Sequence, residues 1–128
     1  MRLLLDTHAF LWWVADSAEL SSRARRAIAA RKNECFVSLA SCWEMAIKVS
    51  IGKLELDGTI ERFVPNHLTA NGFHELPIDV RHTARVTRLP FHHRDPFDRL
   101  LAAQALEEDL AIVSNDPIFR RYGLKRIW

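Results

Sequence analysis

Short apolar runs alternate with longer stretches of helical period along this chain, and this alternation constrains the fold more than any other feature. The apolar runs are too short for helices and are typical of buried strands. Strands that are joined by crossover helices pair in parallel within one sheet. We therefore expect an α/β fold with a mainly parallel sheet of four or five strands. The expected strands are residues 3–5, 35–38, 75–78 and 111–114, with a weaker one at 125–128, and the expected helices are residues 7–15, 22–31, 43–51, 60–70, 80–88 and 96–110.

The length of 128 residues predicts a single domain, residues 1–128, that buries a sufficient core without disulfides. We interpret Cys35 and Cys42 as reduced packing residues. The net charge of +2 does not by itself indicate a nucleic-acid-binding protein. The apolar opening is interrupted by Asp6 and His8 and is shorter than the ~20 residues that cross a bilayer. We expect a soluble cytoplasmic protein with no membrane partner.

Helix-capping patterns account for several acidic residues when each is taken alone. Ser41 and Glu44 have the spacing of a capping box. Asp95 before Pro96 predicts an N-cap that is followed by proline at the first helical position. Asp116 before Pro117 repeats that pattern. Capping alone therefore remains an alternative to a catalytic role for each of these acids.

The positions of four acids relative to the expected strands favour a shared site. Asp6, Glu44 and Asp116 follow strand ends, and Asp98 opens the helix that leads into the fourth strand. The carboxyl ends of parallel strands meet at one edge of the sheet, so these side chains are expected to converge there. Gathered carboxylates repel one another unless a cation binds them. Oxygen ligands without a cluster of His and Cys favour Mg²⁺ or Mn²⁺ over zinc.

Four segments at suitable spacings form a pattern that covers nearly the whole chain. They are Leu4-Leu5-Asp6-Thr7-His8 with Leu11-Trp12-Trp13, residues 38–48 with Trp43-Glu44, residues 94–105, and Ser114-Asn115-Asp116. With these segments the chain resembles the PIN-domain ribonucleases, and specifically the VapC-type toxins of bacterial toxin and antitoxin pairs.

This resemblance implies a PIN-like three-layer α/β/α sandwich and an acidic site formed by Asp6, Glu44, Asp98 and Asp116. The fourth acidic position is the least uniform in such families, and Asp95 does not align with the usual acids. The implied activity is hydrolysis of RNA by a Mg²⁺- or Mn²⁺-dependent endoribonuclease. The implied partners are an RNA substrate, a cognate antitoxin protein and a second copy of the chain in a homodimer.

Basic and aromatic residues suggest further contacts. Arg85, Arg94 and Arg99 are our candidates for RNA phosphates, because Arg81, Arg85 and Arg88 share a helix face and Arg94 and Arg99 flank the acidic run. A solvated helix face is the alternative. Adjacent Trp12 and Trp13 cannot both face one core, so we expect one of them at a contact surface.

The competing hypothesis for function is a non-catalytic PIN-like module that binds RNA or protein. The complete set of four acids favours the enzyme, because a module that only binds has no need to gather negative charge near phosphate.

Overall fold

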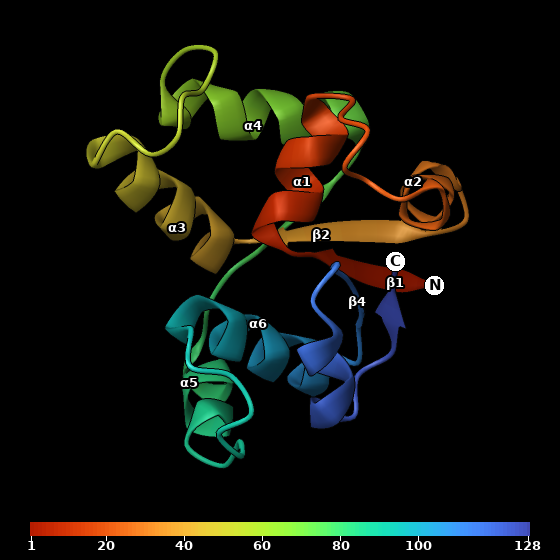
Figure 1. Ribbon diagram of the computed structural model, residues 1–128, viewed down its shortest axis with the longest axis vertical. Helices are drawn as coiled ribbons and strands as arrows, with labels where there is room; N and C mark the ends of the chain where they lie inside the picture. The colour runs from red at the N-terminus through yellow and green to blue at the C-terminus, as the bar shows by residue number, and fades with distance from the viewer.

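A parallel sheet of five strands in the order β3-β2-β1-β4-β5 forms the centre of the computed structural model, which describes residues 1–128 (Figure 1). All neighbouring strands pair in parallel, and β1 in the middle pairs Leu3 with Cys35 on one side and with Ala111 on the other. The strands are β1 (Arg2–Leu5), β2 (Glu34–Ser38), β3 (His74–Leu76), β4 (Ala111–Val113) and β5 (Arg126–Ile127). The predicted parallel sheet is confirmed, including its short fifth strand.

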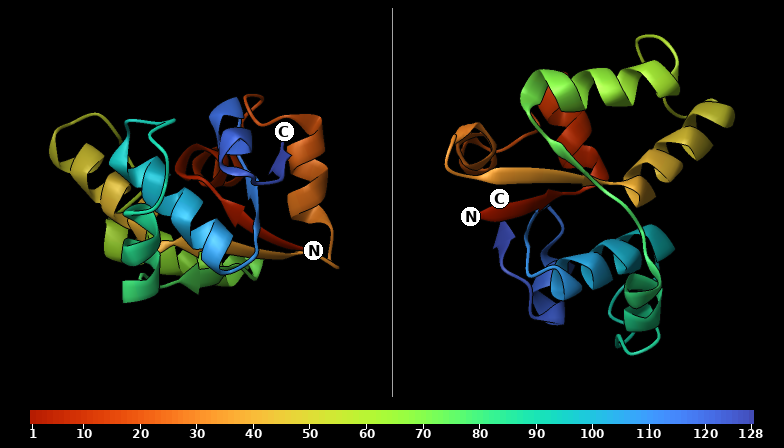
Figure 2. Two further views of the ribbon diagram at one scale, coloured as in Figure 1. Left: turned by 90° about the horizontal axis from the view of Figure 1, so that it is seen from below. Right: turned by 180° about the vertical axis from the view of Figure 1, so that it is seen from behind.

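Helices cover both faces of the sheet and complete a three-layer α/β/α sandwich (Figures 1 and 2). Helices α1, α2 and α4 lie on one face, whereas α5, α6 and the 3₁₀-helix η1 lie on the other. Helix α3 extends from the end of β2 and contacts α1, α4 and α6. The helices are α1 (Thr7–Val14), α2 (Ser22–Ala29), α3 (Leu39–Ser50), α4 (Ile60–Asn71), α5 (Val80–Val86), α6 (Pro96–Glu107) and η1 (Pro117–Tyr122).

The central strand supplies side chains to two hydrophobic cores, one on each face of the sheet. Leu3 and Leu5 pack with Phe10 of α1, whereas Leu4 packs with Leu101 of α6 and Ile112 of β4. Successive side chains of a strand point to opposite faces, so a strand that is covered on both faces is a continuous apolar run. None of the helices has both the length and the apolar character that crossing a membrane requires.

The start of α3 differs from the prediction, and the difference changes the role of Glu44. The helix begins at Leu39 rather than Trp43, and its N-cap is Ser38, whose hydroxyl accepts a hydrogen bond from the Ala40 N–H at 2.9 Å. Ser41 is therefore a buried residue of the first turn and not a cap. The predicted capping box of Ser41 and Glu44 is wrong, so Glu44 is not engaged at a helix end. Cys35 and Cys42 are both free thiols, as expected.

Candidate metal centre

The carboxyl ends of the strands border a pocket of about 430 Å³ that contains all four predicted acids. Asp6 follows β1 directly, Asp116 lies three residues beyond β4, and Asp98 stands in the first turn of α6. Glu44 comes from α3, which continues from β2. In the strand order, β2 and β3 lie on one side of β1, and β4 and β5 lie on the other. The order of the strands therefore reverses at β1, and parallel α/β sheets form ligand crevices at such a point. The pocket is lined by Asp6, Thr7, His8, Trp12, Glu44, Lys48, His93, Asp95, Asp98, Asn115 and Asp116.

Asp6 and Asp116 are helix caps and pocket residues at the same time. Oδ1 of Asp6 accepts a hydrogen bond from the Ala9 N–H at 2.8 Å, and Oδ1 of Asp116 accepts from the Ile118 N–H at 3.0 Å. In each carboxylate the capping hydrogen bond engages Oδ1 only, so Oδ2 is not used by the cap. The capping and site interpretations, which looked like alternatives in the sequence, are therefore compatible.

Glu44 is oriented by two neighbours, one from α1 and one from its own helix. The Thr7 hydroxyl donates to Oε1 at 2.6 Å, and Nζ of Lys48 lies 2.9 Å from Oε2. The Thr7 hydroxyl also lies 2.9 Å from the hydroxyl of buried Ser41. These contacts fix the Glu44 side chain at the rim of the pocket, where it retains only 13% exposure.

His93 joins two of the acids from a loop that precedes α6. Its Nε2 lies 2.9 Å from Oδ2 of Asp116 and 3.1 Å from Oδ2 of Asp98. The Tyr122 hydroxyl accepts a hydrogen bond from the His93 backbone N–H at 2.9 Å, and Nδ1 accepts from the Asp95 N–H at 3.1 Å. Because Nδ1 is an acceptor, the proton of a neutral ring resides on Nε2 and faces the two carboxylates.

Burial and mutual repulsion perturb the acids of this pocket. Burial raises the pKa of Asp98 to about 7, with further increases from the charges of Asp95, Asp6 and Glu44 that His93 partly opposes. Burial also raises the pKa of Asp6, against hydrogen bonds from Ser114 and the Ala9 N–H. A buried carboxyl with a raised pKa lacks a sufficient positive partner within the protein.

The donor set fits a hard divalent cation. The pocket offers oxygen atoms from carboxylates and hydroxyls, and Lys48 is the single lysine or arginine in its lining. Ligand atoms of His93, Asp98 and Asp116 lie within 4.8 Å of one another, and Asp6 and Glu44 lie in the same pocket. A cation at this position would relieve the repulsion that raises the pKa of Asp98.

Comparison with known proteins places the chain in a family. The sequence matches the PIN domain family over residues 3–125. The chain belongs to the PIN domain family. PIN domains are generally nucleases and typically use divalent metal ions, which agrees with the acidic pocket.

Several solved structures share the fold of this PIN domain, although their sequence identity to it is low. VapBC2 from Rickettsia felis, solved with a DNA fragment from its promoter, has 15% identity, a TM-score of 0.71 and full coverage of both chains. FitAcB from Neisseria gonorrhoeae has 18% identity and a TM-score of 0.69, covering 97% of this chain and 95% of that one. VapBC-5 from Mycobacterium tuberculosis, described as a toxin–antitoxin family member, has 15% identity and a TM-score of 0.61, covering 98% and 97%. No curated protein sequence matches the chain.

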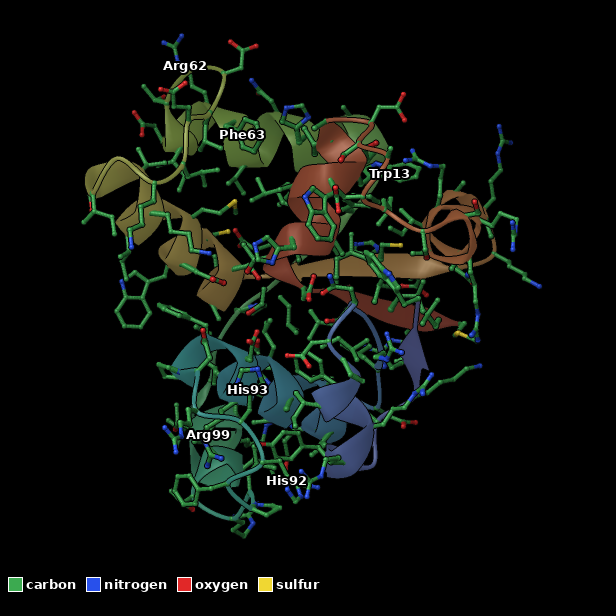
Figure 3. The ribbon with its side chains drawn as sticks, viewed as in Figure 1. Trp13, Arg62, Phe63, His92, His93 and Arg99 are labelled. Carbon is green, nitrogen blue, oxygen red and sulfur yellow. The ribbon has the colours of Figure 1, made fainter.

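The three arginines predicted to bind RNA have different environments, and Arg99 does not fit that role. Its guanidinium is buried and donates to the carbonyl oxygens of Pro90 at 3.0 Å and Val86 at 3.1 Å (Figure 3). It also lies 4.2 Å from the ring centroid of Phe91. We correct the prediction: Arg99 points into the α5–α6 layer and holds the loop, so its charge is not available to a phosphate.

Arg85 also lies away from the acidic pocket of this PIN domain. It pairs with Glu107 at 2.8 Å, at the end of α6 opposite to Asp98. Glu107 stands nine positions after Asp98 in the helix, which corresponds to a rise of about 14 Å. The predicted phosphate strip is thus an ion-paired contact between α5 and α6. Of the three arginines predicted to bind RNA, only Arg94 is exposed, and it stands between the pocket residues His93 and Asp95 in the sequence.

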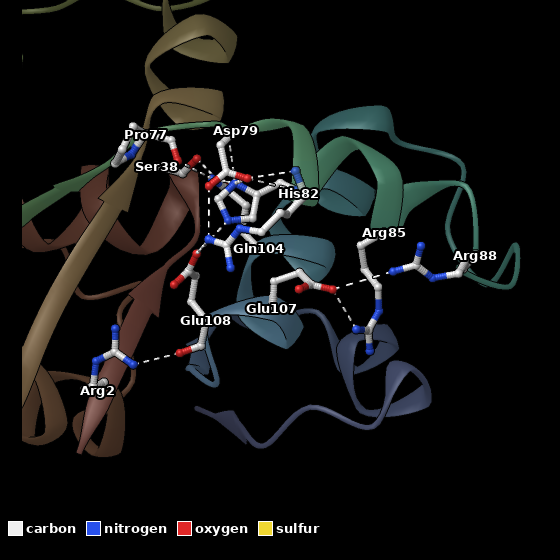
Figure 4. A network of polar contacts seen from close by, with 11 residues as sticks. Arg2, Ser38, Pro77, Asp79, His82, Arg85, Arg88, Gln104, Glu107 and Glu108 are labelled. Carbon is white, nitrogen blue, oxygen red and sulfur yellow. Dashed lines mark hydrogen bonds and ion pairs between the residues drawn. The ribbon is translucent and has the colours of Figure 1, made fainter.

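A second titratable cluster, Asp79, His82 and Glu108, lies at that far end of α6 (Figure 4). Nδ1 of buried His82 accepts from the Asp79 N–H at 3.0 Å, and Nε2 lies 2.9 Å from Glu108. Arg81 contacts Asp79 at 3.0 Å and Glu108 at 2.8 Å. Both ring nitrogens and both carboxylates are thereby engaged, so this cluster ties α5 to α6 and offers no free ligand set for a metal.

Buried Gln104 connects that cluster to the helix that carries Glu44 (Figure 4). Its amide Nε2 donates to the Pro77 carbonyl at 3.2 Å, and its Oε1 accepts from the hydroxyl of Ser38, the N-cap of α3. Gln104 therefore links α6, which bears Asp98, to the start of α3, which bears Glu44.

Sequence reasoning did not place His93, Lys48 and Thr7 among the four acids, where the structure has them. Lys48 and Thr7 carried a usable signal, because Lys48 stands four residues after Glu44 on one helix face and Thr7 follows Asp6. His93 lies in a loop, and only the packing of that loop against Tyr122 places it. The prediction that Trp12 and Trp13 cannot face one core is wrong, because both are half-buried and pack against the core that contains Phe10. Trp43 is instead the exposed tryptophan, at 60%, and it contacts Phe97 edge-on.

Proposed function

We propose that this PIN domain, residues 1–128, is a single nuclease domain that cleaves RNA internally with the help of Mg²⁺ or Mn²⁺, and that it is the toxin of a toxin–antitoxin pair. One observation carries the proposal: four carboxylates from distant parts of the chain line one pocket, in which burial and mutual charge raise the pKa of Asp98. An arrangement that is this unfavourable without a cation suits a site that binds one.

The four acids Asp6, Glu44, Asp98 and Asp116 would hold the ion. When bound, the ion would lower the pKa of a water molecule and offset the charge that develops on the phosphate oxygens. The surrounding residues keep the acids in place: Thr7 and Lys48 hold Glu44, and His93 holds Asp98 beside Asp116. Exposed Arg94, beside the pocket, is the remaining candidate for contact with the RNA backbone.

The partners follow from the neighbours and from one exposed face. Several structures of this fold are described as VapBC or as a toxin–antitoxin complex, which supports a cognate antitoxin as a partner. Trp43 and Ile47 of α3 and its C-cap residue Ile51 are exposed at intervals of four residues and form an apolar face. We assign this face to a second copy of the chain in a homodimer, and we place the activity in the cytoplasm, where RNA substrates are found.

The proposal is tested by incubating purified protein with structured RNA and Mn²⁺, beside the variants Asp6→Asn and Glu19→Gln. Asp6→Asn keeps the shape of the side chain and removes its charge, and it should lower cleavage by about 100-fold or more. Glu19→Gln removes a charge from an exposed position outside the pocket and should cleave like the wild type.

Equal cleavage by wild type and Asp6→Asn would assign the activity to a contaminant or to another site. No cleavage by the wild type, together with no heat of Mn²⁺ binding in calorimetry, would favour a non-catalytic PIN-like module that binds RNA or protein.

A further inference from the structure

An apolar pocket of about 560 Å³ adjoins the acidic pocket and shares part of its wall. The two pockets have His8, Trp12 and Lys48 in common. The remaining wall of the apolar pocket comes from α1, from the segment between α3 and α4, and from Phe63 and His67 of α4 (Figure 3). Leu54 and Leu56 of that connecting segment also line the pocket.

Flat rings line the apolar pocket on two sides. His8 and Trp12 are stacked on the shared wall, with ring centroids 5.1 Å apart and planes inclined by 19°. Phe63 and His67 form a second pair on α4, with centroids 4.5 Å apart. Phe63 is buried, whereas His8 is exposed and Trp12 and His67 are half-buried. Accessible aromatic and imidazole rings are surfaces on which unpaired nucleic-acid bases stack.

The charges of the two pockets differ in a way that suits adjacent parts of one nucleotide. In the apolar pocket, Lys48 and Lys53 are balanced by Glu55 and Asp57, so the space favours an uncharged ring. The ammonium group of Lys48 lies on the wall between the pockets, 2.9 Å from Glu44. Among the residues of the shared wall, Lys48 is the one that carries an ammonium group for a phosphate that enters from this side.

We propose that the apolar pocket holds one unstacked base of single-stranded RNA, next to the phosphodiester that is cleaved in the acidic pocket, with Lys48 beside the connecting phosphate. This inference rests on the proposed ribonuclease function and adds a subsite for a neighbouring base. A protein side chain would also fit an apolar wall. Strand continuity favours the base, because every phosphodiester in the acidic pocket carries a nucleotide on each side and the shared wall is directly beside it.

The test compares one short single-stranded RNA that the protein cuts at one bond with a set of RNAs in which each nucleotide in turn lacks its base. For the wild type with Mn²⁺, we expect one abasic position beside the cleaved bond to lower kcat/KM by about 10-fold, the scale of one base stacked on an aromatic ring. The other positions should have smaller effects.

Trp12→Leu and Trp13→Leu provide a matched pair of variants on one helix. Both tryptophans are half-buried and pack against the same core, but only Trp12 lines the apolar pocket. Trp12→Leu should cleave the intact RNA about 10-fold more slowly and should lose the sensitivity to the abasic position. Trp13→Leu should keep that sensitivity. Leu56→Trp fills the pocket from the segment between α3 and α4 and keeps the core aromatics. It should reproduce the result expected for Trp12→Leu, and it replaces Trp12→Leu in the test if Trp12→Leu does not fold.

The inference is overturned if no abasic position next to the cleaved bond matters, or if Trp12→Leu and Leu56→Trp retain the same sensitivity as the wild type. Unchanged RNA cleavage by both variants, combined with weaker binding of a partner protein, would assign the pocket to a protein segment. Absence of any wild-type cleavage would instead remove the ribonuclease proposal, and this inference with it.

Discussion

Replacing Asp98 with asparagine should stabilise the metal-free protein at neutral and alkaline pH. Burial and the neighbouring acids raise the pKa of Asp98 to about 7, from an ordinary value of 3.8. Between these values the folded protein binds the Asp98 proton more tightly than the unfolded chain does. The free energy of unfolding therefore falls as the pH rises from about 4 to about 7, because the folded state must bury an additional negative charge.

The size of this effect follows from the gap between the two pKa values. One pKa unit corresponds to about 1.36 kcal/mol, so the gap from 3.8 to about 7 corresponds to about 4 kcal/mol at alkaline pH. The Asp98 side chain keeps 26% exposure, and water that reaches it reduces the cost of the charge. We expect the free energy of unfolding of Asp98→Asn to exceed that of the wild type by about 2–4 kcal/mol at pH 8. At pH 5 this difference should be smaller by about 2 kcal/mol.

Urea unfolding in the presence of a chelator, at pH 5 and at pH 8, measures this difference directly. The asparagine side chain retains an oxygen that accepts the hydrogen bond from His93, which keeps the comparison close to charge alone. Glu19→Gln is the matched control, because this exposed carboxylate forms no ion pair and its removal should change stability by less than about 0.5 kcal/mol.

Millimolar Mn²⁺ provides the second half of the test. It should stabilise the wild type at pH 8, because binding to the folded state alone raises the free energy of unfolding, and it should stabilise Asp98→Asn much less. The reasoning is refuted if the variant is no more stable than the wild type at pH 8 in chelator. A wild-type stability that rises between pH 5 and pH 8 relative to the variant would contradict the sign.

Three further outcomes are expected. Arg99→Met should lower the free energy of unfolding by about 3 kcal/mol in urea, because it leaves buried carbonyl groups without a donor, whereas Arg94→Met should change it by less than about 0.5 kcal/mol. Gln104→Leu should cost about 2 kcal/mol and should weaken Mn²⁺ binding in calorimetry, since it removes the link between α6 and the start of α3; unchanged Mn²⁺ affinity would limit Gln104 to a packing role. Thr7→Val, which keeps the shape of the side chain, should lower the cleavage rate more than it lowers stability, because it frees Glu44 from its donor; a proportional loss of both would argue against orientation of Glu44.

Local patterns were sufficient to predict most of the elements. The run Leu3-Leu4-Leu5 is buried on both sides, as a continuous apolar run in a parallel sheet requires. The start of α3 was predicted wrongly because Ser41 and Glu44 match a local capping pattern, yet Ser38 at the end of β2 forms the cap earlier. A short-range pattern cannot distinguish Ser38 from Ser41 as the N-cap, because the choice depends on where β2 ends.

Adjacency in sequence was misleading for Arg99. Successive residues of an α-helix are rotated by about 100° around its axis, so Asp98 faces the acidic pocket while Arg99 faces the α5–α6 layer. His93 shows the reverse case, since it is five residues from Asp98 and twenty-three from Asp116 yet contacts both. Its position depends on loop packing that no periodicity describes.

The sequence by itself determined the parallel α/β architecture and the convergence of Asp6, Glu44, Asp98 and Asp116, because apolar periodicity selects the strands and parallel strands end at one edge of the sheet. Only the tertiary structure decided which charges are available there. It buried Arg99, paired Arg85 with Glu107, and placed His93 and Lys48 among the acids. These outcomes depend on contacts between residues that are distant in sequence, and the direction in which a long polar side chain points is set by the partners that such contacts bring near it.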